Sequence, residues 1–216
     1  MSINAFIFDL DGVLTDTAEY HYLAWAELAN ELGIAFSRED NEHLKGVDRM
    51  ASLAFILDKG GITLDEDKKL QLADKKNQHY QQLINRMSPE DLFEGVLPLF
   101  DQLKQQGIRI GLASASKNAA LVLTRLGITD AFDYIADAAK IAQGKPHPEI
   151  FLTVAKALDI PVHSCVGVED SIAGLHSILD AGMHSIGIGD AEVLAAADLV
   201  YPTIGQLDLA EITTEF

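Results

Sequence analysis

Short apolar segments that alternate with amphipathic stretches are the feature that most limits how this chain can fold. The apolar segments are 5–8, 108–112, 134–136, 165–168 and 185–188, with 198–201 as a sixth candidate. Between them, from residue 95 onward, apolar residues recur at helical spacing over 96–106, 118–126, 148–158 and 172–181. Apolar strands that alternate with helices are typical of a parallel sheet with both faces covered. We therefore predict an α/β fold built on a doubly wound, Rossmann-like parallel sheet.

The stretch between residues 15 and 90 interrupts this alternation and is predicted to be helical. It holds no convincing strand, whereas leucines recur at helical spacing. Asp16 and Glu19 have the spacing of a capping box, and Gly33 can end the first helix. The segments with helical spacing are 23–32, 53–57 and 70–84.

These patterns predict an insertion rather than two domains in series. Two consecutive domains would leave the strand 5–8 without a partner, because the other predicted strands all follow residue 95. We expect residues 1–14 and 91–216 to form the α/β core. Residues 15–90 are expected to form an α-helical cap domain, inserted after the first strand.

The charge balance excludes some partners. The 216 residues include 33 Asp or Glu and 16 Lys or Arg, which gives a formal net charge of −17. Nucleic acid is therefore not an expected partner, because a phosphate backbone demands Lys and Arg. No stretch approaches the roughly 18 apolar residues of a membrane helix, so a membrane partner is not expected either. A phosphorylated small molecule would need a cation in its site.

Cysteine content and the N-terminal residues bear on the compartment. The lone Cys165 has no internal disulfide partner, which fits a reducing compartment. The residues from Met1 to Asn4 carry no basic group, and the apolar segment that follows them stops at Asp9, which is too short for the core of a signal peptide. We expect a cytoplasmic protein.

Polar side chains follow four of the predicted strands. In a parallel sheet, ligands bind outside the carboxyl ends of the strands, so these residues are expected to meet at one edge. Single polar residues in such loops are common, but this combination is much less expected by chance. The residues are Asp9, Asp11, Ser114, Ser116, Lys145, Glu169 and Asp170.

The pair Asp9 and Asp11 fits phosphoryl transfer. A carboxylate ionised at neutral pH can attack phosphorus without a separate base, which makes Asp9 a candidate nucleophile. Asp11 lies two residues on and could face the same pocket as a general acid and base. Gly12 permits a tight turn out of the strand. The alternative is an Asp pair that only opens a turn and caps a helix.

A divalent ion would reconcile these acids with a phosphate. Asp9, Asp170 and a backbone carbonyl form an oxygen-rich set that suits Mg²⁺. Lys145 could add a positive charge at the phosphoryl group. We expect Ser116 to begin the helix that contains Lys117 and Asn118, and the N-terminus of that helix could bind an anion. The alternatives are a solvated loop lysine at 145 and helix capping by Ser116 and Ser171.

Four short motifs together resemble the haloacid dehalogenase superfamily of phosphotransferases. Their order and spacing match that family, and the helical insertion lies where the family places its cap domain. The motifs are Asp9-x-Asp11-Gly12-Val13, the strand that ends in Ser114, Lys145-Pro146 and Gly167-x-Glu169-Asp170-Ser171. The resemblance implies a core of that family's type.

Within that superfamily the chain is similar to the β-phosphoglucomutase family over nearly its whole length. The residues that carry this likeness are Asp9 to His21, Leu44 to Arg49, Lys76-Asn77 and Ala113 to Asn118. The resemblance implies that β-D-glucose 1-phosphate and β-D-glucose 6-phosphate are interconverted. The intermediates would be an aspartyl-phosphate and glucose 1,6-bisphosphate, which also acts as primer.

The same resemblance implies a role for each motif residue. Asp9 would be the phosphorylated nucleophile and Asp11 the general acid and base. Thr17 would lie at the hinge, while His21 and Lys76 would link cap closure to the placement of Asp11. One Mg²⁺ would be held by Asp9, the carbonyl of Asp11 and Asp170, with Glu169 nearby. The transferring phosphoryl group would contact Ser114 and Lys145, and the remaining sugar phosphate would contact Lys45, Gly46, Val47, Arg49, Ala115, Ser116, Lys117 and Asn118.

Other interpretations share the core motifs. A sugar-phosphate phosphatase would use every one of them, and a phosphonate hydrolase would add a lysine on the cap. A receiver domain that only accepts a phosphoryl group places its aspartate after a middle strand, unlike Asp9. Asp48 beside Arg49 could weaken the anion site if it points inward. We expect a small phosphorylated sugar as substrate and a monomeric chain.

Overall fold

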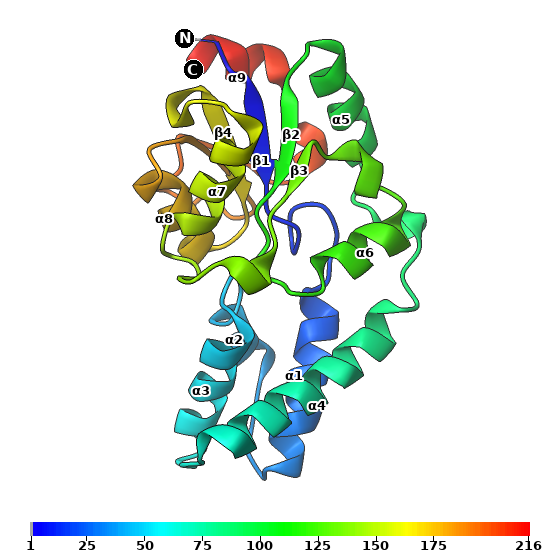
Figure 1. The fold of residues 1–216 in the computed structure, drawn as a ribbon, viewed down its shortest axis with the longest axis vertical. Helices are drawn as coiled ribbons and strands as arrows, with labels where there is room; N and C mark the ends of the chain where they lie inside the picture. Colours follow the sequence, from blue (N-terminus) through cyan, green and yellow to red (C-terminus); the bar gives the residue numbers. More distant parts are fainter. Residues whose placement is uncertain (1) are drawn as a thin grey trace.

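Six parallel strands form one sheet in the spatial order β3-β2-β1-β4-β5-β6. The structure, a computed structural model, describes residues 2–216, so Met1, the first residue of the expected core, lies outside it. The strands are β1 (Ala5–Phe8), β2 (Arg109–Leu112), β3 (Tyr134–Ile135), β4 (Cys165–Glu169), β5 (His184–Ile188) and β6 (Leu199–Tyr201). The chain winds outward from β1 on one side and from β4 on the other, which confirms the doubly wound prediction (Figure 1). The switch point lies between β1 and β4.

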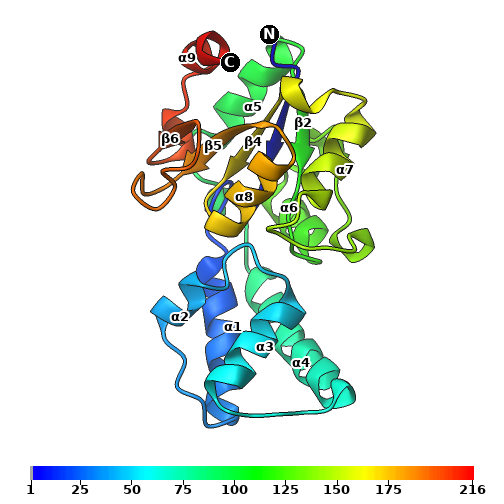
Figure 2. The same cartoon turned by 90° about the vertical axis from the view of Figure 1, so that its left-hand side faces the viewer.

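Helices cover both faces of this sheet, as a parallel sheet requires. One face packs on α5, α6 and α9, and the other on α7 and α8 (Figure 2). These helices are α5 (Val96–Gln105), α6 (Ala119–Leu126), α7 (Glu149–Leu158), α8 (Ile172–Asp180) and α9 (Leu209–Glu215). Short 3₁₀ segments occupy Pro89–Asp91, Thr129–Ala131, Ala138–Lys140, Val162–Ser164 and Ile204–Gln206.

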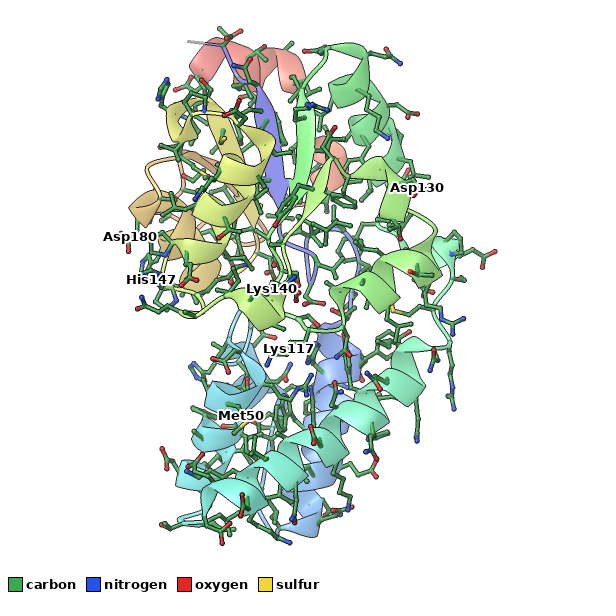
Figure 3. All side chains as sticks on the ribbon, viewed as in Figure 1. Met50, Lys117, Asp130, Lys140, His147 and Asp180 are labelled. Carbon is green, nitrogen blue, oxygen red and sulfur yellow. The ribbon has the colours of Figure 1, made fainter. Side chains whose placement is uncertain are left out.

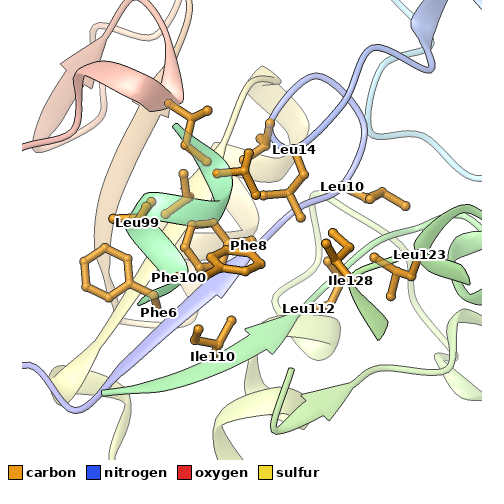
Figure 4. Packing of buried hydrophobic residues seen from close by; sticks show 14 of the residues in the cluster. Phe6, Phe8, Leu10, Leu14, Leu99, Phe100, Ile110, Leu112, Leu123 and Ile128 are labelled. Carbon is orange, nitrogen blue, oxygen red and sulfur yellow. The ribbon is translucent and has the colours of Figure 1, made fainter. Parts of the chain in front are cut away.

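The largest hydrophobic cluster lies between the sheet and α5. Phe6 and Phe8 of β1 are fully buried there, and the rings of Phe8 and Phe100 are 5.3 Å apart (Figure 4). Because β1 is central and apolar throughout, it anchors the loop that follows it. That loop begins with Asp9, so packing around Phe8 fixes where the first motif lies.

The segment between β1 and α5 forms a separate group of helices below the sheet (Figure 1). They are α1 (Ala18–Glu31), α2 (Arg38–Glu42), α3 (Arg49–Lys59) and α4 (Glu66–Ile84). They enclose a hydrophobic cluster of their own that includes Trp25, Leu28, Leu53 and Ile56. The cap of residues 15–90 and its exact limits remain our proposal, which this separate cluster supports.

Some local predictions in this region were wrong. Asp16 and Glu19 do not form a capping box: Asp16 Oδ1 accepts from the backbone N–H of Ala18 at 3.1 Å, and Glu19 pairs with Arg38. Leu23, expected on the buried helix face, is 39% exposed, because α1 packs through Trp25 and its neighbours instead. None of the helices formed by residues 2–216 is long and apolar enough to cross a membrane.

Glycines in the strands allow α7 and α8 to approach the sheet closely. An added Cβ at Gly167 in β4 would lie 2.5 Å from Cγ1 of Ile178, a side chain of α8.

We expect Gly167→Ala to lower the free energy of unfolding by about 1–3 kcal/mol, because the new methyl group overpacks this contact. Gly167→Ala combined with Ile178→Ala should be more stable than the two separate losses predict, since the clash is removed. Urea unfolding of the four proteins measures this coupling, and strict additivity would contradict the packing described.

Candidate active site

A cavity of about 390 Å³ lies between the carboxyl edge of the sheet and the inserted helices. Its lining comes from both parts of the chain. The sheet side supplies Asp9, Asp11, Ala115, Ser116, Lys117, Asn118, Lys145 and Asp170, and the insertion supplies His21, Lys45, Gly46, Val47, Arg49 and Lys76. In Figure 3, Lys117 lies between the two parts. The expected residues Thr17, Ser114 and Glu169 are fully buried and are not part of this lining.

A buried ion pair crosses the switch point. Nζ of Lys145 donates to Oδ1 of Asp9 at 2.7 Å and also to Oε1 of Glu169, and the lysine side chain has no exposed surface. The neighbouring carboxylates raise the pKa of Lys145 above its usual value despite burial, so the lysine stays charged. Burial raises the pKa of Asp9 to about 7, and Lys145 opposes that rise.

The loops after β1 and β4 bring Asp11 and Asp170 beside Asp9. The hydroxyl of Thr17 donates to Oδ1 of Asp11 and fixes that carboxyl, while burial raises its pKa. Gly12 has φ +80°, and a Cβ there would lie 2.1 Å from Oδ2 of Asp170. Only glycine therefore lets the turn pass the Asp170 carboxylate.

Oxygen ligands for a metal ion gather at this point. Carboxylate oxygens of Asp9, Glu169 and Asp170 lie within 4.8 Å of one another. Oε2 of Glu169 already accepts from the N–H groups of Asp170 and Ser171 and from the Ser171 hydroxyl, at 2.9–3.0 Å. Burial raises the pKa of Asp170, and Nζ of Lys45 lies 3.9 Å from its Oδ2. The residues present fit a hard cation held mainly by Asp9 and Asp170.

A buried cluster of the insertion faces these carboxylates from the other side. Nζ of Lys76 lies 2.9 Å from Nδ1 of His21 and 4.5 Å from the ring centre of Trp25. Burial, together with the charge of Arg49, lowers the pKa of Lys76 to about 7. Burial also lowers the pKa of His21, so its neutral ring can accept a hydrogen bond from the ammonium group.

The loop after β2 lines the same cavity. Ser114 is fully buried, and its oxygen accepts from the N–H of Ser116 at 3.1 Å. The prediction that Ser116 begins a helix was wrong: α6 begins at Ala119, and Oγ of Ser116 accepts from the N–H of Asn118 at 3.2 Å. The loop therefore offers side chains to the cavity, rather than a helix N-terminus at residue 116.

Arg49 and its neighbours form the opposite wall. Arg49 is the first residue of α3, and Asp48 caps that helix by accepting from the N–H groups of Met50 and Ala51 at 2.8 and 3.2 Å. Asp48 is thus engaged by its own helix rather than by the Arg49 guanidinium. Gly46, with φ +71°, lies so close to the core that a Cβ would be 2.5 Å from Oγ of Ser171.

Two nearby residues were missed in the sequence. Tyr80 is fully buried, its ring centre lies 4.1 Å from that of His21, and its hydroxyl has no hydrogen-bond partner among residues 2–216. Gln81 donates to Oδ1 of Asn118 at 2.9 Å. Tyr80 follows Lys76 and Gln81 follows Asn77 by four residues, so i, i+4 spacing from those two residues was the available signal.

Comparison with known proteins agrees with this geometry. The family model described as "haloacid dehalogenase-like hydrolase" matches residues 3–182. The β-phosphoglucomutase of Bacillus subtilis (strain 168) is 45% identical, with 99% of this chain and 96% of the relative covered. Hexitol phosphatase B of Escherichia coli (strain K12) is 29% identical, with 99% and 96% covered.

A solved structure gives the same result. The crystal structure of β-phosphoglucomutase from Clostridium difficile matches with a TM-score of 0.96 and 47% identity, over 99% of this chain and 96% of that one. The agreement extends through the insertion as well as the sheet, because nearly all of both chains is covered. The chain therefore belongs to the β-phosphoglucomutase family of the haloacid dehalogenase-like hydrolases.

Proposed function

We propose that this protein is a Mg²⁺-dependent β-phosphoglucomutase that interconverts β-D-glucose 1-phosphate and β-D-glucose 6-phosphate. The phosphoryl group would pass through Asp9, with glucose 1,6-bisphosphate as intermediate and primer. The names of the relatives from Bacillus subtilis and Clostridium difficile support this substrate class.

One observation carries the proposal: a single cavity joins a nucleophile to a second set of cationic and polar groups. Asp9 and Lys145 lie at the sheet side, while Arg49, Lys117 and Asn118 line the same space. A volume of about 390 Å³ lies in the range of roughly 300–1,000 Å³ found for small-ligand pockets. A hexose with a phosphate at each end needs two such anion sites.

The first half-reaction follows from the sheet side. A carboxylate oxygen of Asp9 attacks phosphorus, the bond from phosphorus to the sugar oxygen breaks, and Asp11 donates a proton to that oxygen. Burial, which raises the pKa of Asp11, favours the protonated form that this step needs. Lys145 neutralises charge on the phosphoryl oxygens, and Mg²⁺, when held by Asp9 and Asp170, supplies further neutralisation.

The second half-reaction reverses these roles. Asp11 removes a proton from the 6-hydroxyl of β-D-glucose 1-phosphate, this oxygen attacks the aspartyl-phosphate, and the bond from phosphorus to Asp9 breaks, which restores the carboxylate and forms the bisphosphate. The bisphosphate must exchange ends before Asp9 attacks the phosphate at C1, so each phosphate occupies the Arg49 side in turn. Arginine suits that side because its planar fork binds a phosphate through two hydrogen bonds.

The first test concerns the nucleophile. Asp9→Asn keeps the shape of the side chain and an acceptor for Lys145, but removes the ionised nucleophile. We expect the rate of isomerisation to fall by roughly 10⁴–10⁶-fold, and chelation of the metal to stop the wild-type reaction. Isomerisation and free phosphate are measured together on β-D-glucose 1-phosphate with a trace of bisphosphate. Undiminished activity in Asp9→Asn would rule out the mechanism, and phosphate release without isomerisation would favour a sugar-phosphate phosphatase.

The second test concerns the far end of the cavity. Arg49→Ala should reduce kcat/KM for isomerisation by about 10- to 100-fold, since a charge-assisted, bidentate contact is lost. Hydrolysis of p-nitrophenyl phosphate, which carries one phosphate, should fall much less. Arg38→Ala is the matched control, because Arg38 pairs with Glu19 on the surface. Equal loss of both activities in Arg49→Ala would contradict a role at the second phosphate.

The third test uses the pKa of Lys76, which burial lowers to about 7. The charged ammonium is present below this pH and is lost as the pH rises through it. We therefore expect KM for β-D-glucose 1-phosphate to rise above pH 7 by up to about tenfold per pH unit. Lys76→Met should raise KM at pH 6 and remove this dependence. A pH profile that stays the same in Lys76→Met would assign the titration to another group.

A further inference from the structure

A chain of three amide side chains joins helix α4 to the loop after β2. Nε2 of Gln81 donates to Oδ1 of Asn118 at 2.9 Å, and Nδ2 of Asn118 donates to Oδ1 of Asn77 at 2.8 Å. Asn118 is 8% exposed, and both of its partners are supplied by the insertion. The orientation of a residue on the core is therefore set by two residues of α4.

These two hydrogen bonds determine which atom of the Asn118 amide can reach a ligand. The carbonyl oxygen is occupied by Gln81, and one N–H of the amide is used on Asn77. An amide nitrogen has two hydrogens, so one donor remains. Asn118 lines the cavity together with Ser116 and Lys117. With the amide reversed, the remaining group would be a carbonyl oxygen, which repels a phosphate.

We propose that Gln81 is a positioning residue that holds the Asn118 amide with a donor free for the second phosphate of the sugar. Asn77 completes the arrangement by accepting the other amide hydrogen. This inference rests on the proposed function, because that function requires a second phosphate. The anion site is then complete only when α4 is packed on the loop 114–118.

A simple tether between the two parts of the chain is the competing explanation. The structure contains a matched example: Nη2 of Arg125 on α6 donates to Oδ1 of Asn85, which follows α4, at 2.7 Å. Neither residue lines the cavity. Asn85→Ala removes a hydrogen bond between the same two parts without changing Asn118. The exposed Gln82→Ala controls for loss of a glutamine at the next position of the helix.

The test measures the dissociation constant of glucose 1,6-bisphosphate by calorimetry, with Mg²⁺ present, in the full chain carrying Asp9→Asn so that no transfer occurs. Gln81→Ala should weaken binding about 2- to 10-fold, as expected for one neutral hydrogen bond. Gln81→Glu should weaken it further, because its carboxylate presents an acceptor to the Asn118 oxygen. Gln82→Ala and Asn85→Ala should bind like the parent. In active enzyme, Gln81→Ala should raise KM more than it lowers kcat.

A double-mutant cycle separates positioning from general damage. With Asn118→Ala already present, Gln81→Ala should cause no further loss of binding. An unchanged constant in Gln81→Ala, an equal loss in Asn85→Ala, or a full further loss beside Asn118→Ala would each overturn the proposal. If the wild-type chain binds the bisphosphate but catalyses no isomerisation, the proposed mutase activity is refuted, while the positioning role of Gln81 is not. If the chain does not bind the bisphosphate, both the mutase activity and the role of Gln81 are overturned.

Discussion

The contact of Lys145 with Asp9 and Glu169 is the interaction on which the site depends. Carboxylates of Asp9, Glu169 and Asp170 lie within 4.8 Å of one another, at the end of two fully buried strands. Two like charges at that separation repel by roughly 3–4 kcal/mol at an effective dielectric constant of 20. One buried ammonium group balances only part of this excess. The arrangement is therefore poised for a further cation, as expected of a site that must attract phosphate in a protein of net charge −17.

This concentration of charge is possible because the backbone leaves room for it. An added Cβ at Gly174 would lie 1.8 Å from Oε1 of Glu169, and one at Gly12 would overlap Asp170. The glycines bring α8 and the turn after β1 against the carboxylates, so the N–H groups of residues 170 and 171 can bond to Glu169. Charge, backbone conformation and sheet topology thus meet at the switch point between β1 and β4.

Most of the sheet could be predicted from the sequence because its strands are buried on both faces and read as continuous apolar runs. Observed strands and core helices begin and end within about a residue of the expected limits, although α2 and α9 were not predicted. The errors arose where distant residues decide the outcome. Glu19 has the spacing of a capping residue, yet Arg38, 19 positions away, pairs with it instead. Likewise, the buried face of α1 depends on the helices packed against it, so Leu23 could not be placed by periodicity.

In the candidate site, too, residues set by the local pattern could be predicted, whereas residues set by distant contacts could not. The residues that follow strands could be predicted because the ends of parallel strands meet at one edge, and the structure brings Asp9, Lys145 and Glu169 together there. For Gln81 and Tyr80 the sequence offered only the weaker signal of i, i+4 spacing from Asn77 and Lys76. Their surroundings exist only once α4 packs against Asn118 of the core and against the His21 ring of α1.

The arrangement of the site between the sheet and the insertion also explains how one core can serve different reactions. A 29% identical relative is named hexitol phosphatase B, and such a core needs only to form an aspartyl-phosphate. Whether water or a sugar hydroxyl then attacks depends on which is held in line and which is excluded. In this chain the insertion supplies Arg49 and Lys76 to the same cavity that contains Asp9, and Gln81 bonds to Asn118, which also lines that cavity. A bound sugar phosphate would contact both walls at once and occupy the space that water needs. Selectivity for the sugar hydroxyl would then arise from the helices of the insertion, while the sheet supplies the chemistry.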